Sequence, residues 1–360
     1  MKVCIIGDGL VSLTLANVLV KKEILVDILV NQKSSKYDKT RTLGISKSNI
    51  DYFNNEVVEI KKILWPINNI KIFTEKNSND EILNFKDKKA EIFSIVKNYE
   101  LKKLLFKKIK KNKFIKFKSD KNFQNFHNSQ YNLIINCNPK NKITKKFFSV
   151  RMEKNYESYA YTTIINHRKI VNNNTAYQNF TKNGPIAYLP ISETQTSVVY
   201  SMRSKMKKNN SDIKKLIRKF NPIYSIKKIY DCSSMELKSS NLRKYYRNNI
   251  LAFGDLIHKI HPLAGQGFNM SLRDIQLLST IIDKKINLGL DIGSSTCYEF
   301  QKKSKDKNYL FSTGIDYIYE IFKFESKINS NFLSKSINLV GKNKIINSLF
   351  KKIADFGFRA

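Results

Sequence analysis

Residues 251–274 read LAFGDLIHKIHPLAGQGFNMSLRD. The pattern predicts a buried strand over 250–254, a loop rich in glycine and proline, and a helix over 268–282. Asp255 follows the strand and is placed to accept hydrogen bonds from sugar-type hydroxyls. Gly265 and Gly267 let backbone approach a flat ligand, and the start of the helix offers N–H donors to a developing anion. The stretch therefore predicts a ligand site at a strand end.

The N-terminal residues also combine a buried strand, a glycine-containing turn and a helix, in a pattern typical of phosphate binding. A buried strand over 3–6 runs into Gly7-x-Gly9-x-x-Ser12, a helix over 13–20 and a second strand over 24–30. Gly7 permits the tight turn, Gly9 lets a pyrophosphate approach the backbone, and Ser12 allows close packing of helix and strand. The acidic residue expected after the second strand is absent, and Asn31 stands in that region, where it can still donate one hydrogen bond to a ribose.

The apolar runs predict how the chain is organised. Strands over 3–6, 131–136 and 250–254 are expected in one parallel sheet, while those over 159–165, 175–181, 186–190 and 196–202 predict an antiparallel layer. Residues 41–54 are expected to form a loop leading into a helix, and strands over 70–73 and 92–96 to flank a polar hairpin. The fold class is therefore α/β (α+β), with a discontinuous Rossmann-like domain (1–70, 97–150, 243–295), an inserted antiparallel-sheet domain (71–96, 151–242) and a C-terminal helical region (296–360).

The charge of the chain permits two interpretations. The formal net charge is +35, which suits an anionic partner such as a membrane surface but also follows from the amino-acid bias of an A/T-rich genome. The run 106–118 interleaves lysines with phenylalanines, as expected for a phosphate- or lipid-binding surface or for a solvated helix end and strand. No nucleic-acid recognition motif accompanies the charge, so a nucleic-acid partner is not expected.

The histidines and cysteines argue against a metal-binding protein, and the apolar runs argue against a membrane-spanning one. His258 and His261 lack a third ligand nearby, and the four cysteines lack metal or redox spacing, so no metal site is expected. His127 and His167 are expected at the surface. No apolar run reaches the ~20 residues of a membrane span, and the first strand begins at once, so we expect a cytoplasmic protein without a signal peptide.

The segment His261–Asn269, with Arg273 and Asp274, resembles the signature of the ubiquinone-biosynthesis hydroxylases, a family of group A flavoprotein monooxygenases with the p-hydroxybenzoate hydroxylase fold. Residues 41–46 and 180–190 resemble further family segments in the same order. The resemblance implies that Asp255 binds the ribityl chain of FAD, that Arg41 contacts FAD, and that Pro262 and the backbone of residues 265–269 line the flavin ring. The predicted cofactor-binding residues are Gly7, Gly9, Ser12, Asn31, Arg41, Gly254, Asp255, Pro262, Gly265, Gln266, Gly267, Phe268 and Asn269.

The family resemblance also implies a reaction. NADH or NADPH reduces FAD, dioxygen adds to form a flavin hydroperoxide, and the ring of a polyprenylated phenol is hydroxylated in ubiquinone biosynthesis. His261 and Pro262 are expected beside the reacting flavin ring, and no acid or base is assigned. Such substrates favour a peripheral position on the inner face of the cell membrane, and contacts within a ubiquinone-synthesis complex.

Two alternatives stay open. The family's acidic residue, glycine and arginine after the strand over 131–136 are replaced by Asn138, Pro139 and Lys145. Proline removes a backbone donor, so the chain could be a catalytically degraded scaffold of such a complex. It could also be another FAD oxidoreductase of the same fold.

Overall fold

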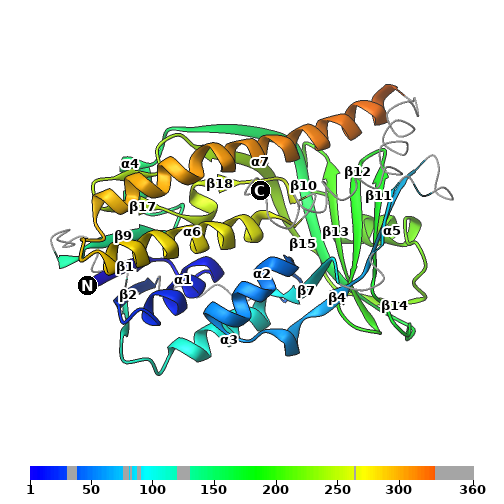
Figure 1. The fold of residues 1–360 in the computed structure, drawn as a ribbon. Coiled ribbons are helices and arrows are strands. Elements are labelled where there is room, and N and C mark those ends of the chain that lie inside the picture. Colours follow the sequence, from blue (N-terminus) through cyan, green and yellow to red (C-terminus); the bar gives the residue numbers. More distant parts are fainter. Residues whose placement is uncertain are drawn as a thin grey trace.

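The protein combines a parallel sheet, a larger mainly antiparallel sheet and a small sheet between them (Figure 1). The computed structural model describes residues 1–30, 39–75, 81, 83–86, 91–119, 130–262 and 265–328. Asn31, His127 and the segment after residue 328 lie outside these ranges, so the expectations made for them are not addressed by the structure.

The parallel sheet confirms the expected association of distant segments. Strand β1 pairs with β2 on one side and β9 on the other, and β9 pairs with β17, all in parallel. Most of their side chains are apolar and buried. This is typical of a parallel sheet, because both of its faces are covered by other elements. The strand order is β16 (Tyr246–Arg247), β17 (Ile250–Ala252), β9 (Leu133–Asn136), β1 (Lys2–Ile6), β2 (Leu25–Val30), β8 (Ile115–Ser119).

Helices cover the parallel sheet and contact one another. Helix α1 packs against α3 and α6, and apolar residues of all three join the largest hydrophobic core. Their bounds are α1 (Leu10–Val20), α3 (Asn98–Ile109) and α6 (Gly267–Asn287), with a short helix α4 (Lys142–Phe147) after β9 and a 3-10 turn η5 (Gly254–Leu256) after β17.

The large sheet contains the expected antiparallel layer. Helix α5 (Asn210–Lys219) covers one face, where Ile213 and Ile217 pack against side chains of the central strands. We call the opposite side, which faces the parallel-sheet part in Figure 1, the inner face. The strands are β18 (His258–Lys259), β15 (Ser233–Leu242), β10 (Arg151–His167), β13 (Gln195–Arg203), β12 (Gly184–Pro190), β11 (Thr175–Thr181), β5 (Asn69–Thr74) and β6 (Leu83–Lys86), with β14 (Ile226–Ile229) paired to β10.

The small sheet corrects two expectations. Residues 42–46 form a strand, β3 (Thr42–Ser46), where a loop was expected, because they pair with β7 (Phe93–Lys97), which also pairs with β4 (Trp65–Ile67). The strands expected over 70–73 and 92–96 therefore do not form one hairpin: the first belongs to the large sheet and the second to the small one. After β3 follow α2 (Lys47–Tyr52), a π-helix η1 (Phe53–Val57) and a 3-10 turn η2 (Lys61–Ile63).

Helix α7 (Ser294–Ile328) lies along both parts of the molecule (Figure 1). Its first half packs Phe300 into the main core, and Phe311 and Ile315 contact Met270 of α6. Further along, Tyr319 joins a cluster with side chains of β10 and β15. The expected C-terminal helical region is thus one long helix over its described residues. None of the described helices combines the length and apolarity needed to cross a bilayer.

Candidate functional site

The ends of β1, β9 and β17 bring the two motifs of the sequence to one edge of the parallel sheet. A Cβ atom at Gly7 would lie 3.8 Å from the Cβ of Asn138, which follows β9. A Cβ atom at Gly254 would lie 3.1 Å from a methyl carbon of Val11 in α1. Because the carboxyl ends of parallel strands form the usual binding crevice of such sheets, this edge is the candidate site.

The turn between β1 and α1 leaves its backbone open to a ligand. Gly7 has φ +114°, which glycine tolerates best, and its N–H donates to the carbonyl of Leu29 at 3.0 Å. Gly9 precedes the helix in extended conformation, and no atom lies within 4 Å of the place where its Cβ would be. Ser12 is buried directly behind the turn. This cradle fits a pyrophosphate at a helix N-terminus.

Asp255 is an exposed carboxylate beside this turn. It is the second residue of the 3-10 turn η5, which begins at Gly254 with φ +63°. Within the described part of the chain, no hydrogen bond or ion pair engages it. Burial raises the pKa of the neighbouring Cys137 thiol to about 12, and the charge of Asp255 adds to that shift. Asp255 is therefore free to accept hydrogen bonds from ligand hydroxyls, while Cys137 stays protonated.

The loop before α6 lies against β3. A Cβ atom at Gly265, which has φ +61°, would lie 3.8 Å from the backbone nitrogen of Gly44. The buried Oε1 atom of Gln266 accepts no hydrogen bond from the described residues. Such an orphaned acceptor at a helix start suits a ligand that donates a hydrogen bond there. Phe268 is buried and packs its ring 6.4 Å from that of Phe53.

Asn269 has a structural role that the sequence did not reveal. Its side-chain oxygen accepts from the backbone N–H of Ser46 and from Nδ2 of Asn49, both at 3.0 Å. Its amide nitrogen donates to the carbonyl of Gly44 at 2.9 Å. The side chain therefore joins α6 to β3 and α2 through three hydrogen bonds, and a ligand would meet the backbone of this residue.

Two buried histidines anchor the segment that precedes the loop. His258 Nε2 lies 2.7 Å from a carboxylate oxygen of Asp274, which also accepts from Asn308 of α7 at 3.1 Å. His261 packs between Tyr156 of β10, at 4.8 Å edge-on, and Tyr319 of α7, at 4.4 Å. Both histidines thus fix the chain ahead of Pro262, and no group of three metal-ligating side chains occurs among the residues described.

Burial decides the charge of His261. Desolvation lowers its pKa to about 4, and the nearby Lys154 contributes in the same direction. The imidazole is therefore neutral at physiological pH. It lies in an aromatic cluster, where Tyr156 donates its hydroxyl to Asp316 of α7. A part as a general acid is not supported, because the neutral imidazole lacks the acidic proton of the imidazolium form and its remaining N–H is too weakly acidic.

Arg41 lies at the border between the small and large sheets. Its side chain is exposed, and Nη2 lies 3.3 Å from the sulfur of Met235 in β15. The neighbouring Thr42 hydroxyl lies 2.8 Å from that of Ser197 on the inner face of the large sheet. Arg41, the predicted FAD contact, therefore directly precedes β3, a strand of the small sheet that is also joined to the large sheet.

The altered segment after β9 forms a self-contained polar turn. Asn138 accepts a hydrogen bond from the backbone of Lys140 at 2.9 Å, and Thr144 donates to the Asn138 carbonyl at 2.7 Å. Asn141 caps α4 by accepting from the N–H of Thr144. Asn138 thus stabilises the turn without supplying the negative charge of the family's acidic residue.

His167 is not at the surface, as the sequence suggested. Its ring is 2% exposed, and its nitrogens lie 2.7 Å from the carbonyl of Arg168 and 3.0 Å from the hydroxyl of Thr196. Thr196 becomes a neighbour because β10 pairs with β13. The residue belongs to the core of the large sheet.

The inner face of the large sheet carries a row of partly exposed side chains. Val199, Ala187, Gln178 and Ile72 are successive register partners on β13, β12, β11 and β5. All four are half-buried, whereas their neighbours Val198 and Tyr188 on the other face are buried beneath α5. The row offers a mainly apolar surface toward the candidate site.

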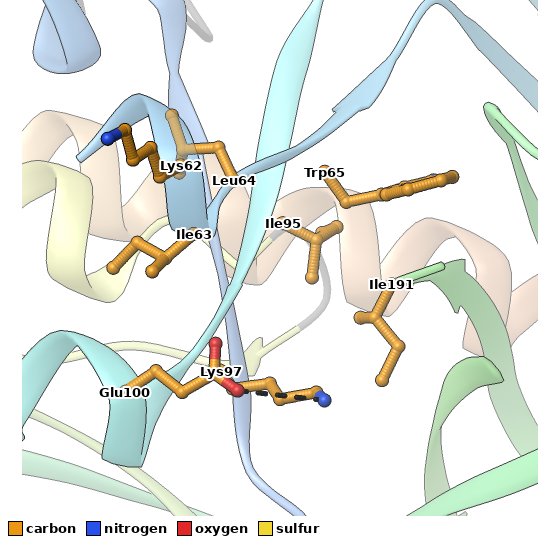
Figure 2. A pocket seen from close by; sticks show the side chains of 8 residues that line it. All are labelled: Lys62, Ile63, Leu64, Trp65, Ile95, Lys97, Glu100 and Ile191. Atoms are coloured by element: carbon orange, nitrogen blue, oxygen red, sulfur yellow. Dashed lines mark ion pairs between the residues drawn. The ribbon is translucent and has the colours of Figure 1, made fainter. Parts of the chain in front are cut away.

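A separate pocket of about 150 Å³ opens at the small sheet. Figure 2 shows Trp65, Ile95 and Ile191 on one side and the ion pair of Lys97 and Glu100, at 3.7 Å, on the other. Ligand pockets for whole cofactors span roughly 300–1,000 Å³, so this one is too small for a dinucleotide. None of the predicted cofactor residues lines it.

Comparison with known proteins agrees with the expected resemblance. Residues 152–288 match the family described as FAD binding domain. The ubiquinone biosynthesis monooxygenase COQ6, mitochondrial, of Danio rerio is 23% identical over 53% of this chain and 48% of its own length. The human protein of that name is 26% identical over 45% of this chain and 44% of its own length. The matched part thus spans about half the length of these curated relatives.

Solved structures show the fold. Klebsiella pneumoniae HpxO, complexed with FAD and uric acid, superimposes with a TM-score of 0.77 at 12% identity, covering 99% of this chain and 97% of HpxO. The p-nitrophenol 4-monooxygenase PnpA of Pseudomonas putida DLL-E4 gives a TM-score of 0.78 at 11% identity, covering 99% and 98%. The chain therefore has the fold of FAD-dependent monooxygenases, which confirms the fold class expected from the sequence.

Proposed function

We propose that the protein is an FAD-dependent monooxygenase that hydroxylates the ring of a polyprenylated phenol in ubiquinone biosynthesis, with NADH or NADPH and dioxygen. One observation carries the proposal: the open turn at Gly9 and the free carboxylate of Asp255 follow β1 and β17 at one edge of the parallel sheet, and the loop 265–267 leads into α6, which packs against α1 and η5. The relatives named as ubiquinone biosynthesis monooxygenases supply the reaction class.

The residues present fit FAD. The Gly7–Gly9 backbone and the N-terminus of α1 would hold the pyrophosphate, and Asp255 would accept hydrogen bonds from ribityl hydroxyls. Gly265, Gly267 and the orphaned Gln266 Oε1 would border the flavin ring, with the first N–H groups of α6 beside it. Bound FAD supplies the redox and oxygen-transfer chemistry.

The protein's own task is to position the substrate and exclude water. The half-buried row on the inner face would receive the phenol ring and the start of its prenyl chain, because these groups gain from leaving water. The neutral His261 cluster holds the loop in place without adding a charge. We retain the sequence-derived domain bounds as part of this proposal, with residues 71–96 and 151–242 forming the substrate domain.

A lipid-soluble substrate implies contact with a membrane surface. We propose peripheral attachment from the cytoplasmic side, with further contacts in a ubiquinone-synthesis complex. The strongly basic chain favours attachment to anionic lipid.

The test is the visible spectrum of the purified protein followed by turnover. Flavin bands near ~370 and ~450 nm, bleached by NADH or NADPH faster when a polyprenylphenol is present, together with a product heavier by one oxygen, would support the enzyme. A protein that neither carries FAD nor can be loaded with it would contradict this function and favour the scaffold. In that case the charge lost at Asn138 would be the first explanation to test.

A further inference from the structure

The C-terminal half of α3 and the strand β8 form a surface that the proposed site does not use. Residues 101–119 contain nine lysines and no acidic residue. About half of this segment is thus lysine, whereas 65 of the 360 residues of the whole chain are lysine or arginine. A uniform compositional bias does not account for such a concentration.

Most of this charge is not neutralised within the protein. Lys102 pairs with Asp8 at 3.0 Å, and Lys118 pairs with Asp27 at 2.8 Å. The other seven lysines of the segment form no ion pair with any residue that the structure describes. Among them, Lys103 and Lys110 stand three residues before and four after Phe106, so they flank it on the helix surface.

Two phenylalanines stand exposed among these lysines. The rings of Phe106 on α3 and Phe117 on β8 have centroids 5.3 Å apart. They are 41% and 37% exposed, although burying them would stabilise the fold by about 1.5–3 kcal/mol each. Strand β8 is also an edge of the parallel sheet as far as the described strands extend. We call these residues, with Lys113 between the two elements, the α3–β8 surface.

We propose that the α3–β8 surface docks the protein onto an anionic phospholipid bilayer. Lysine ammonium groups would pair with lipid phosphates, and the two phenylalanine rings would enter the boundary between headgroups and acyl chains, where such apolar rings gain from leaving water. The rings pack against each other, which leaves less free ring face than nucleobase stacking needs. The inference extends the membrane contact proposed above and rests on it for its biological purpose, but its geometry is independent of FAD.

Co-sedimentation with vesicles tests the proposal. The full chain should bind phosphatidylcholine vesicles containing ~30% phosphatidylglycerol, and pure phosphatidylcholine vesicles far more weakly. Because the K103Q/K110Q/K113Q variant loses three lysines that would lie near the lipid phosphates, it should bind on the order of 100-fold more weakly. The F106S/F117S variant should lose affinity even in high salt, and Trp fluorescence of F117W should shift to the blue on anionic vesicles.

A matched variant separates this surface from general net charge. K205Q/K207Q/K208Q removes three exposed lysines that flank the exposed Met206 and form no ion pair with described residues. It should bind vesicles as the unmodified protein does. Equal losses in both triple variants, or binding of single-stranded RNA through Lys103, Lys110 and Lys113 without vesicle binding, would overturn the proposal. FAD loading is measured in parallel, so failure of this surface is distinct from failure of the proposed enzyme.

Discussion

His261 illustrates how a single residue shapes the behaviour of the site. It is buried between two tyrosines, and its pKa is lowered to about 4 from the usual 6.5. An imidazole with a depressed folded-state pKa contributes stability that is complete above the unfolded pKa and is lost as pH falls toward the folded pKa. The protein should therefore lose on the order of 3 kcal/mol of unfolding free energy between pH 6.5 and 4 through this group.

The measurement is urea denaturation across that pH range for the unmodified protein and the His261→Phe variant. Phenylalanine keeps an aromatic ring between Tyr156 and Tyr319 but does not titrate. The variant should show a flatter dependence in this window. Identical slopes would mean that His261 does not carry the effect.

Asn269 is the second residue whose removal should be costly. Asn269→Ala deletes three hydrogen bonds, two of them buried, that join α6 to Gly44, Ser46 and Asn49. We expect a loss of about 2–3 kcal/mol of unfolding free energy, because buried polar groups lose their partners. Ser271→Ala, on the same helix, removes only a bond to the helix's own backbone at 3.3 Å and is the control. Equal effects of the two substitutions would contradict a special role for Asn269.

The sequence predicted residue roles only where they depend on local chain geometry. Gly7 and Gly9 were recognisable because the turn is built from consecutive residues. The partners of Asn269 lie more than 200 positions away in sequence, and the contact of His167 with Thr196 depends on strand pairing. The orphaned Gln266 and the aromatic neighbours of His261 likewise required the assembled fold.

At the level of elements, a substitution in the turn between β1 and α1 should affect cofactor binding without affecting the stability of the fold. Gly9 has φ −73° and open space at its Cβ position, so Gly9→Ala should leave the apo-protein's stability almost unchanged. The added methyl group should obstruct a pyrophosphate and weaken FAD binding by roughly tenfold or more. Flavin fluorescence titration and thermal unfolding of the apo-protein measure the two effects.

A control for this substitution lies on α7. Gly314 also has no atom within 4 Å of its Cβ position, and Gly314→Ala should stabilise the helix by up to about 1 kcal/mol with unchanged FAD affinity. If Gly9→Ala binds FAD normally, the phosphate cradle lies elsewhere.

Helices and strands were predictable from the sequence when the apolar pattern of their own residues indicated them. The strands β1, β9 and β17 are short apolar runs and were expected in one sheet. Strand β3 has only two apolar residues, Leu43 and Ile45, with a glycine between them, and this short signal was interpreted as a loop. Its extended conformation comes from pairing with β7, about 50 residues later.

At the scale of the whole molecule, we propose that the parallel sheet binds FAD and that the large sheet binds the substrate. The edge of the parallel sheet has the open backbone of the Gly7–Gly9 turn and the carboxylate of Asp255. The inner face of the large sheet has the row of half-buried side chains that includes Ala187. Helix α7 contacts both parts, through Asn308 to Asp274 of α6 and through Tyr319 to the large sheet. The proposed division of labour predicts that substrate and FAD binding can be impaired separately.

Ala187→Trp tests this division. Ala187 lies between its register partners Val199 and Gln178 on the inner face, so a large ring there should fill space that a prenylated substrate needs. Product formation from a long-chain polyprenylphenol, measured by mass spectrometry, should fall by at least about tenfold, with the flavin spectrum unchanged. Tyr177→Trp, on the opposite face of the same sheet, is the control and should keep activity. If Ala187→Trp retains full turnover, the substrate does not use the inner face; if it loses FAD as well, the two sheets do not act independently.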